Sequence, residues 1–452
     1  MRLRKTITTI VVTAILLAGW QLFAVIANQP ELIPSLPRLV RTLCEWLVSG
    51  SFYQSVGATI LRGVLGMSIS FVCAIGMAGL FARFEWVYEL FRPLLAIMRS
   101  IPVISFILLA LIFLNPESIP LMIAFLTMFP LLTENLTRGI LDLRPGLSIM
   151  ARQFHIKRSN VLFQIIYPQL KPFLYSGLAS AAGFGWRAII MGEVLSQCAF
   201  GIGSEMKRAQ NFISVPELLA WTIVAVFISF FFDKGISKVA DITPKISFAN
   251  EDQTIPTPTL SVLDTKDISY QYGIQHFSHS FQKGIIYGIS APSGKGKTTL
   301  LNLIGGILLP TEGEIHPTRH FGIATIFQQP QLLPHLTAEE NIILPLSSFL
   351  TEEKARRIAQ KHLQEMEMEP FGNRYPKELS YGQQQRIAIA RALAYPSPLL
   401  LMDEPFKGLD EALSHRIIER IREKQMKEER IILFTSHNPD EIRLLADEVI
   451  YL

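Results

Sequence analysis

Hydrophobic residues are distributed unevenly along this chain. Before about residue 235 they form six long apolar runs, separated by short stretches that contain charge and proline. Several runs reach about 20 residues, the length that a helix needs to cross the hydrocarbon core of a bilayer. We therefore predict a helical membrane region with about six spans, near residues 6–27, 56–81, 90–114, 119–136, 173–196 and 215–232.

The pattern changes in the second part of the chain. Short apolar segments at 285–289, 399–402 and 431–434 are typical of buried parallel strands, and they alternate with helical and polar segments. We predict an α/β domain here. The intervening residues 240–259 contain proline, threonine and acidic residues without an apolar period, which is typical of an exposed linker. The predicted organisation is a membrane domain at 1–239 with an inside loop near 141–172, a linker at 240–260 and an α/β domain at 261–452.

Composition and charge agree with this division. Of 452 residues, 49% are hydrophobic and 18% are charged, which excludes a purely soluble protein. A net charge of +4 gives no argument for a nucleic-acid partner. Arg2, Arg4 and Lys5 precede the first run, and further basic residues gather in the loops on the same predicted side, so the positive-inside rule places both termini in the cytoplasm. The first run could instead be a cleaved signal peptide.

Among the charged residues inside the predicted spans, Arg62, Arg187 and Glu193 are candidates for a functional role. Such residues either contact a transported solute or form hydrogen bonds in the bundle interior. Arg187 and Glu193 are six positions apart and do not share one helical face, so we do not expect them to pair locally.

The strand at 285–289 is followed by a loop rich in glycine and lysine and then by a helix, which is the context of a phosphate-binding loop. Backbone N–H groups and the helix N-terminus form a cradle for anions there. Ala291 replaces the first glycine of the usual pattern, which is tolerable if its φ is negative. We expect Lys297 to reach the outer phosphates of ATP and Thr298 to bind Mg²⁺. The predicted ATP-binding residues of the loop are Ser293, Gly294, Lys295, Gly296, Lys297, Thr298 and Thr299.

Residues 379–386, Leu-Ser-Tyr-Gly-Gln-Gln-Gln-Arg, lie shortly before the strand that ends in Asp403 and Glu404. This arrangement resembles the signature of ATP-binding cassette (ABC) ATPases. The resemblance implies that Ser380, Gly382 and Gln383 bind the ATP held by a second cassette, so that the protein acts as a dimer. Tyr381 replaces the first glycine of the family's Gly-Gly pair.

Further motifs resemble this family and imply roles for single residues. Glu404 resembles the residue that polarises the attacking water, Asp403 the Mg²⁺ ligand, and His437 the switch residue that contacts the γ-phosphate. Gln328 resembles the Q-loop residue near Mg²⁺ and the water, and Asp410 the D-loop residue where two cassettes touch. Tyr272 is expected to stack on adenine, with Tyr270 as the rival.

The inside loop resembles the coupling loop of binding-protein-dependent ABC permeases. Ala151, Ile165 and Pro168 match that loop in spacing, whereas Ile149 stands at its glutamate position and His155 at its glycine position. Residues 32–37, 99–103, 192–194 and 201–203 are similar to segments of the nitrate, sulfonate and taurine permease group.

The resemblances together imply an importer in the bacterial inner membrane with a cytoplasmic ATPase. It would act as a homodimer embedded in membrane lipid, use ATP and Mg²⁺, and receive its solute from an extracytoplasmic binding protein. The solute would be a small anion such as a sulfonate or nitrate, or a vitamin precursor. Two alternatives remain at this point: an ABC exporter, and a membrane scaffold whose cassette binds nucleotide without hydrolysing it.

Overall fold

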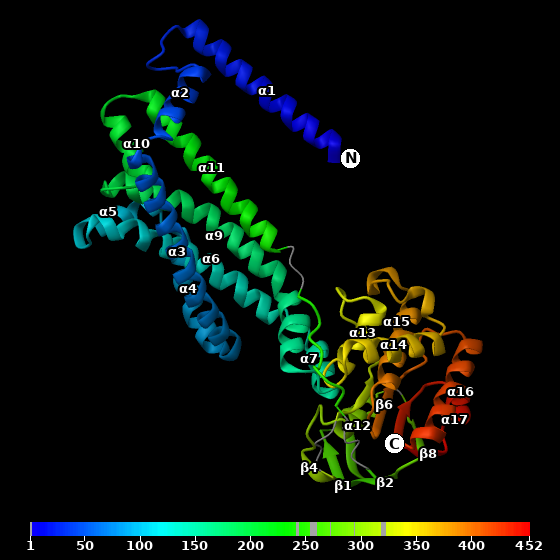
Figure 1. Cartoon of the computed structure of the whole chain (residues 1–452). Coiled ribbons are helices and arrows are strands. Elements are labelled where there is room, and N and C mark those ends of the chain that lie inside the picture. The colour runs from blue at the N-terminus through cyan, green and yellow to red at the C-terminus, as the bar shows by residue number, and fades with distance from the viewer. Residues whose placement is uncertain (1, 241–243, 254–259, 272, 293, 318–321) are drawn as a thin grey trace. The chain divides into compact units, whose positions relative to one another are not determined.

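The computed structural model describes residues 2–240, 244–253, 260–271, 273–292, 294–317 and 322–452, without the side chains of residues 2–6, 9 and 10 (Figure 1). The chain forms two compact units. Unit 1 comprises Met1–Leu143 and Gln169–Thr243, and unit 2 comprises Arg144–Pro168 and Pro244–Leu452. Tyr272, which was predicted to stack on adenine, and Ser293, which was predicted to bind ATP, lie outside the described residues.

Unit 1 is helical. Small residues on the buried face of its longest helix allow close packing, since a Cβ built on Gly66 would lie 2.7 Å from the Cβ of Ala124. The helices of this unit are α1 (Arg2–Ala27), α2 (Leu36–Trp46), α3 (Gly50–Arg83), α4 (Glu85–Ser100), α5 (Val103–Phe113), η1 (Pro116–Ser118), α6 (Ile119–Leu141), α9 (Tyr167–Ser196, which starts in unit 2), α10 (Ile202–Asn211) and α11 (Val215–Ala240).

Among the described residues, four or five candidate membrane spans can be recognised, compared with the six apolar runs of the sequence. Within the described residues, four helical segments are long and apolar enough to cross a membrane: Gly50–Arg83, Pro116–Leu141, Arg158–Ser196 and Val215–Ala240. A bent pair, α4 with α5, makes a fifth if it counts as one span. The first run forms α1, Arg2–Ala27, of which Val11–Ala27 is a continuous apolar helix among the fully described residues.

The predicted run 90–114 is broken rather than straight. Helices α4 and α5 meet at an angle of 94°. Ile101 at the break has φ −70° and ψ 130°, an extended conformation. Pro102 follows it, and the ring of a proline excludes helical geometry from the preceding residue. The sequence correctly predicted that this run is apolar, but it did not predict the break between α4 and α5.

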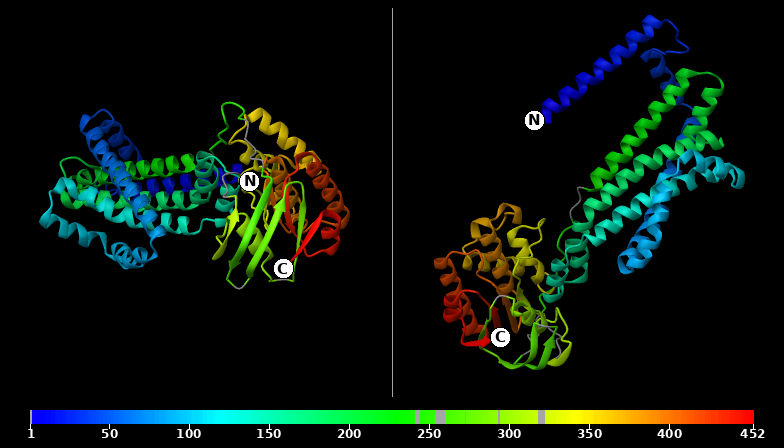
Figure 2. Two further views of the ribbon diagram at one scale, coloured as in Figure 1. Left: turned by 90° about the horizontal axis from the view of Figure 1, so that it is seen from below. Right: turned by 180° about the vertical axis from the view of Figure 1, so that it is seen from behind.

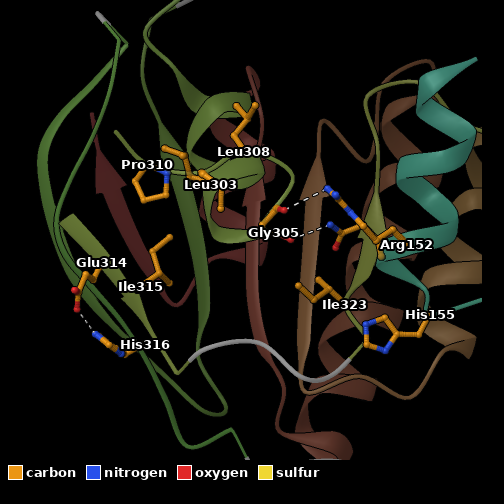
Figure 3. A pocket seen from close by; sticks show the side chains of 13 residues that line it. Arg152, His155, Leu303, Gly305, Leu308, Pro310, Glu314, Ile315, His316 and Ile323 are labelled. Carbon is orange, nitrogen blue, oxygen red and sulfur yellow. Dashed lines mark hydrogen bonds and ion pairs between the residues drawn. The ribbon is translucent and has the colours of Figure 1, made fainter. Parts of the chain in front are cut away.

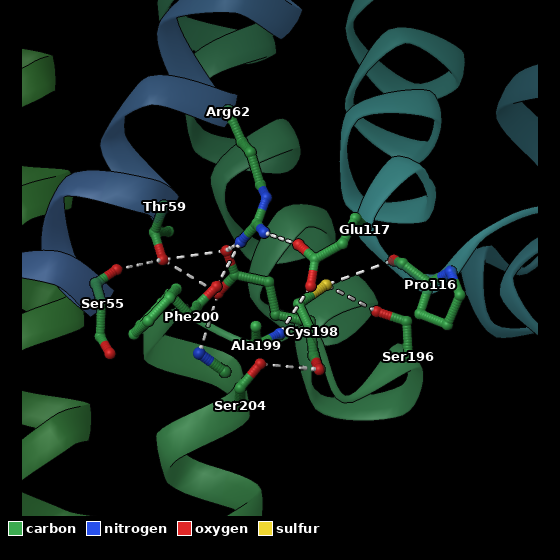
Figure 4. A network of polar contacts seen from close by, with 12 residues as sticks. Ser55, Thr59, Arg62, Pro116, Glu117, Ser196, Cys198, Ala199, Phe200 and Ser204 are labelled. Atoms are coloured by element: carbon green, nitrogen blue, oxygen red, sulfur yellow. Dashed lines mark hydrogen bonds and ion pairs between the residues drawn. The ribbon is translucent and has the colours of Figure 1, made fainter.

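A buried polar network lies in unit 1 (Figure 4). The carboxylate of Glu193 is fully buried, and it accepts hydrogen bonds from the Arg62 guanidinium (2.7 Å), the Thr59 hydroxyl (2.9 Å) and the Gly203 N–H (2.9 Å). Arg62 also pairs with Glu117 at 2.6 Å. Of the two roles considered for charges in the spans, Arg62 and Glu193 therefore have the bundle-interior one.

Unit 2 has two sheets and a group of helices. A three-stranded antiparallel sheet has the order β2-β1-β4, and a five-stranded parallel sheet has the order β5-β6-β7-β3-β8. Figures 1 and 2 show the antiparallel sheet and the helices α13, α14 and α15 on opposite sides of this unit. The strands are β1 (Val262–Tyr270), β2 (Ile274–Gln282), β3 (Ile286–Ser290), β4 (Glu312–His316), β5 (Ala324–Ile326), β6 (Leu399–Asp403), β7 (Ile431–Thr435) and β8 (Glu448–Tyr451).

The helices of unit 2 cover the parallel sheet, and the strands β6 and β7 are buried at every position, as their continuous apolar sequence predicts. The helical segments are α7 (Pro145–Gln153), α8 (Arg158–Asn160), the π-helical η2 (Val161–Ile166), α12 (Lys297–Ile304), α13 (Ala338–Leu346), α14 (Glu352–Glu365), η3 (Glu369–Phe371), η4 (Pro376–Glu378), α15 (Tyr381–Ala394), α16 (Glu411–Glu428) and α17 (Pro439–Leu445).

The compact units do not follow the domain limits expected from the sequence. Residues 144–168, expected to be part of the membrane domain, contribute Phe154 and Ile165 to the core of unit 2. Part of the expected linker also packs there, because the N–H of Ala249 donates to the Ser347 carbonyl at 3.0 Å. The parts of the linker at 241–243 and 254–259 lie outside the described residues.

Candidate functional site

The parallel sheet gathers the candidate residues at one edge. In its register Ile289 of β3 lies opposite Thr435 of β7, and Thr435 lies opposite Asp403 of β6. Because all three strands run in the same direction, the segments that follow them meet at their carboxyl ends. This edge is where ligands bind in open α/β sheets.

The loop after β3 has the geometry of an anion cradle. Gly294 and Gly296 have φ values of 82° and 88°, which only glycine adopts without strain. A Cβ on Gly296 would also lie 2.8 Å from the carbonyl oxygen of Gly273. Ala291 is not among the described residues with positive φ, so its methyl group is accommodated. The unpaired N–H groups at the start of α12 are therefore available to an anion.

Two side chains of α12 face the ends of β6 and β7. The ammonium of Lys297 donates to the Ala291 carbonyl at 2.7 Å and lies 3.4 Å from Nδ1 of His437. The Thr298 hydroxyl donates to the Asp403 carboxylate at 2.9 Å. A hydroxyl beside a carboxylate is the oxygen donor set that Mg²⁺ prefers. These residues therefore fit the metal ion that the sequence predicts.

Asp403 is held by both neighbouring elements. Its carboxylate also accepts a hydrogen bond from the Thr435 hydroxyl at 2.8 Å, and burial raises its pKa above the usual range. Thr435 was not among the site residues predicted from the sequence. A polar residue at the end of an otherwise apolar strand was the signal that could have found it.

Glu404 follows Asp403 in a strained conformation, with φ at 49°. Its N–H donates to the carbonyl (3.2 Å) and the hydroxyl (3.1 Å) of Thr435, which hold this turn in place. Its carboxylate lies 2.9 Å from Nε2 of His437 and 3.3 Å from the Lys407 ammonium. Burial alone would raise the pKa of Glu404, but Lys407 and the side chain of Gln328 outweigh it and hold that pKa below its usual range.

The signature residues begin helix α15. The Ser380 hydroxyl accepts a hydrogen bond from the Gln383 N–H, and the Gln383 side chain accepts one from the Ser380 N–H, so the two form a capping box. Gly382 is required by close packing, since a Cβ there would lie 2.5 Å from the Gly408 carbonyl oxygen. Ser380 and Tyr381 are exposed at this helix end.

Asp410 and Tyr270 were also candidates. The Asp410 carboxylate accepts a hydrogen bond from the Leu413 N–H at 2.9 Å and thereby caps α16. This cap occupies one carboxylate oxygen of Asp410, and the side chain remains exposed. Tyr270 is the last residue of β1 and is partly buried.

The predicted coupling loop lies against the core of unit 2. The buried side chain of Gln153 donates to the Gly305 carbonyl at 2.8 Å, and its own carbonyl accepts from the Ile323 N–H. Phe154 is fully buried, with its ring 5.2 Å from that of Tyr395 and 5.4 Å from the Arg391 guanidinium. These contacts join positions more than 150 residues apart, and no local sequence signal predicts them.

The four residues that define this loop in the sequence have different environments. Ala151 and Ile165 are buried in the core of unit 2, and Pro168 is partly buried at the start of α9. His155 is exposed with φ at 47°, so the histidine retains the left-handed backbone that glycine would have at this position. The departure from the family pattern therefore leaves the main-chain path intact.

A cavity of about 590 Å³ opens between this loop and the end of α12 (Figure 3). Arg152 and His155 line it from the loop, and Leu303 and Gly305 line it from α12. Arg152 donates to the Gly306 carbonyl at 3.3 Å, and partial desolvation of the His155 ring by the surrounding protein lowers its pKa below the usual range. The cavity lies beside the loop contacts and does not include the residues at the sheet edge.

Comparisons with known families divide the chain in the same order. Residues 66–233 match the family described as binding-protein-dependent transport system inner membrane component. Residues 274–407 match the family described as ABC transporter. The first matched region precedes the predicted linker at 240–260, and the second matched region follows it.

Curated relatives match the second part of the chain. The Fe(3+) ions import ATP-binding protein FbpC of Rhizobium etli is 35% identical over 40% of this chain and 54% of its own length. The thiamine import ATP-binding protein ThiQ of Yersinia pseudotuberculosis is 34% identical over 42% of this chain and 86% of its own length. The chain thus spans about half the length of the first curated relatives that it matches.

A third relative is the uncharacterized ABC transporter ATP-binding protein MJ0796 of Methanocaldococcus jannaschii, with 34% identity over 40% of this chain and 85% of its own length. A dimeric structure of the MJ0796 cassette, in a post-hydrolysis state bound to ADP and phosphate, covers 42% of this chain and 94% of that chain. Its TM-score is 0.40 at 32% sequence identity.

Proposed function

The chain belongs to the ABC transporter family, and from this premise we propose that it couples ATP hydrolysis to the import of a small anion. The observation that carries the proposal is the pair of matched regions on one polypeptide: an importer-type permease region at 66–233 and a cassette region at 274–407. The permease match and the apolar helices indicate a membrane protein. We assign it to the bacterial inner membrane with the cassette in the cytoplasm.

ATP would bind at the carboxyl edge of the parallel sheet. The N–H groups after Gly294 and the ammonium of Lys297 would hold the phosphates, and Lys297 would exchange its present bond to a backbone carbonyl for a phosphate oxygen. Thr298 and Asp403 would hold Mg²⁺, which neutralises charge on the phosphates when it is bound. Lys295 in the loop and Thr299 in the first turn of α12 would support these contacts.

Glu404 would act on the attacking water. Its carboxylate is kept ionised by Lys407 and Gln328, so it can accept a hydrogen bond from water and orient it. His437 contacts both Glu404 and Lys297, which places its ring between the group that handles water and the group that handles phosphate. This geometry supports its role as the residue that senses the γ-phosphate.

A second copy of the chain would complete each ATP site. Ser380, Gly382 and Gln383 lie at the start of α15, where Ser380 is exposed and the positive end of the helix dipole suits an anion. The exposure of Ser380 supports a nucleotide that comes from outside the chain, and the exposed Asp410 is available for a contact between cassettes. We therefore propose a homodimer with two composite sites.

Arg187 supports an anionic solute. It lies on α9, nine residues before the helix ends at Ser196, which is about 14 Å along the axis. It is exposed and makes no hydrogen bond or ion pair with the residues that the structure describes. An unpaired cation inside a span is costly and usually marks a solute pathway.

The surroundings of Arg187 fit a small organic anion. With Trp186, Met191, Met206 and Phe230 it lines a mainly apolar cavity of about 780 Å³ in unit 1. Such a cavity can receive one charged group and a short apolar body. A sulfonate meets this description, and nitrate would use the cation alone. An extracytoplasmic binding protein would deliver the solute.

The test is uptake by the full chain reconstituted in lipid vesicles with its binding protein. ATP is enclosed in the lumen, on the cassette side, and Glu404→Gln is the inactive variant. Glu419→Gln, an exposed carboxylate on α16, is the matched control. We expect ATP-dependent uptake by the wild type and the control and a loss of about 10²-fold or more in Glu404→Gln.

Other outcomes identify the alternatives. Movement of the solute away from the cassette side, without any binding protein, would identify an exporter. Equal ATP hydrolysis by the wild type and Glu404→Gln, at the level of empty vesicles, would identify a nucleotide-binding scaffold.

A further inference from the structure

Tyr381 replaces a glycine of the family signature, and its side chain makes two contacts that glycine cannot make. Its hydroxyl donates to the backbone carbonyl of Gln328 at 2.8 Å. Its ring lies against Gly408, where a built Cβ would be 2.8 Å from the Tyr381 Cδ1 atom. Gly408 has φ at 80°, so this position needs glycine for two reasons. One side chain thus joins the start of α15 to two loops.

Helix α15 holds the same segment at a second point. The guanidinium of Arg391 donates to the carbonyls of Gln331 (2.8 Å) and Pro330 (2.9 Å). Arg391 is fully buried and lies ten residues after Tyr381, about 15 Å along the helix. The segment 328–331 is therefore tied to α15 at both of its ends. A shift of the helix must carry this segment with it.

The Gln328 end of the segment reaches the water-handling group. The side chain of Gln328 lies close enough to the carboxylate of Glu404 to lower its pKa, while the backbone carbonyl of Gln328 accepts a hydrogen bond from the Tyr381 hydroxyl. The main chain of Gly382 lies against Gly408 at the same point. The exposed start of α15, Gln328 and Glu404 are consequently linked by side-chain contacts within one chain.

We propose that Tyr381 is a positioning residue that transmits binding at the signature to Gln328 and Glu404 of the same cassette. The inference rests on the proposed function, in which the signature binds the nucleotide of a second copy. Pressure on the start of α15 by that nucleotide would set the Gln328 amide against Glu404. Hydrolysis in one site would then depend on occupation of the other, and the hydroxyl of Tyr381 would carry the dependence.

The experiment measures ATP hydrolysis by the full chain in lipid as a function of ATP concentration. Tyr381→Phe keeps the ring and removes only the hydroxyl bond. We expect kcat to fall about three- to tenfold, the value of one lost hydrogen bond, with KM nearly unchanged and the Hill coefficient reduced towards one. Tyr451→Phe removes a hydroxyl from a tyrosine that is 79% exposed, and it should behave as the wild type.

A second variant separates the ring from the hydroxyl. Tyr381→Gly restores the family residue and should lose at least as much cooperativity as Tyr381→Phe. Faster hydrolysis by Tyr381→Gly than by the wild type would overturn the proposal, because the ring would then obstruct the signature. Wild-type kinetics of Tyr381→Phe would overturn it as well. If the wild type and Tyr451→Phe hydrolyse no ATP, the proposed function itself fails, which is a distinguishable result.

Discussion

At the scale of single residues, charges decide what each part of the protein can bind. Arg62 and Glu193 neutralise each other in the interior of unit 1, where either charge alone would be costly. Arg187 is exposed to a cavity of the same unit, which Asp233 also lines, and it forms no ion pair with the described residues. The sequence identified all three charges as unusual. It could not show which of the three form an ion pair, because Arg62 and Glu193 are 131 positions apart.

Removing the Arg187 charge should affect transport rather than hydrolysis. In Arg187→Ala we expect the uptake of an anionic solute to fall about 10- to 100-fold, the value of a charged hydrogen bond, while basal ATP hydrolysis stays within about twofold. Arg187→Lys should recover part of the uptake. Uptake of small sulfonates and nitrate in vesicles checks this, with the exposed Arg92→Ala as the control. Unchanged uptake by Arg187→Ala would contradict the proposal that Arg187 binds an anionic solute.

His362 should make the stability of unit 2 depend on pH. Burial and the charges of Lys424 and Lys361 lower its pKa from 6.5 to about 3. Its Nε2 lies 3.1 Å from the Lys424 ammonium, and its Nδ1 lies 2.6 Å from a Glu365 oxygen. Between pH 6.5 and 3 the unfolded chain binds a proton that the folded chain does not bind, so stability is lost as the pH falls through this range.

We therefore expect acid to destabilise the wild type more than His362→Gln, by about 2 kcal/mol at pH 5 relative to pH 7. The measurement is the thermal unfolding midpoint of both proteins across this range. Parallel curves for the two proteins would show that His362 titrates normally in the folded chain.

At the scale of elements, short breaks determine what a long apolar run becomes. Residues 90–114 are apolar enough for one span, yet Pro102 turns Ile101 out of helical geometry and separates α4 from α5. The proline was visible in the sequence. Its effect depends on whether neighbouring helices support a kinked helix or a complete break, which is a tertiary question.

The coupling loop shows the same dependence on partners. Its anchor, Phe154, packs against Tyr395 and Arg391, which belong to a distant part of the sequence. In Phe154→Ala we expect the loop to lose about 3–5 kcal/mol of packing energy. Uptake should fall at least about tenfold, and ATP hydrolysis should no longer respond to the loaded binding protein.

Parallel measurements of uptake and hydrolysis test this effect. Lys157→Ala is the matched control, since Lys157 uses its backbone N–H to bind Ser348 and its side chain is exposed. A Phe154→Ala protein whose hydrolysis still rises with the binding protein would contradict the anchoring role.

At the scale of the whole molecule, two copies should share their ATP sites. Lys297→Ala damages the site that a chain provides for its own ATP, and Ser380→Arg damages the one that it provides for its partner. Neither variant alone should hydrolyse ATP at more than about a hundredth of the wild-type rate. Co-expression of the two should restore part of the hydrolysis, because one site of each mixed dimer combines two intact parts while the other site remains damaged. Absence of recovery would contradict composite sites, and the double variant co-expressed with the wild type is the control.

The sequence by itself determined the broad plan of this protein. Apolar runs long enough for a bilayer, short buried strands and a glycine-rich loop between strand and helix are local patterns, because backbone geometry and solvent impose them on neighbouring residues. They predicted a helical membrane region, an α/β nucleotide-binding domain and most of the residues now found at the edge of its parallel sheet.

Only the tertiary structure decided which distant groups meet. The pairing of Arg62 with Glu193, the burial of Phe154 in unit 2 and the bond from Tyr381 to Gln328 all join residues that are far apart in the chain. Such contacts depend on how whole elements pack, and packing responds to the volume and polarity of many side chains together. A local sequence pattern does not specify the combined effect of many distant side chains. These contacts could therefore be identified only from the fold.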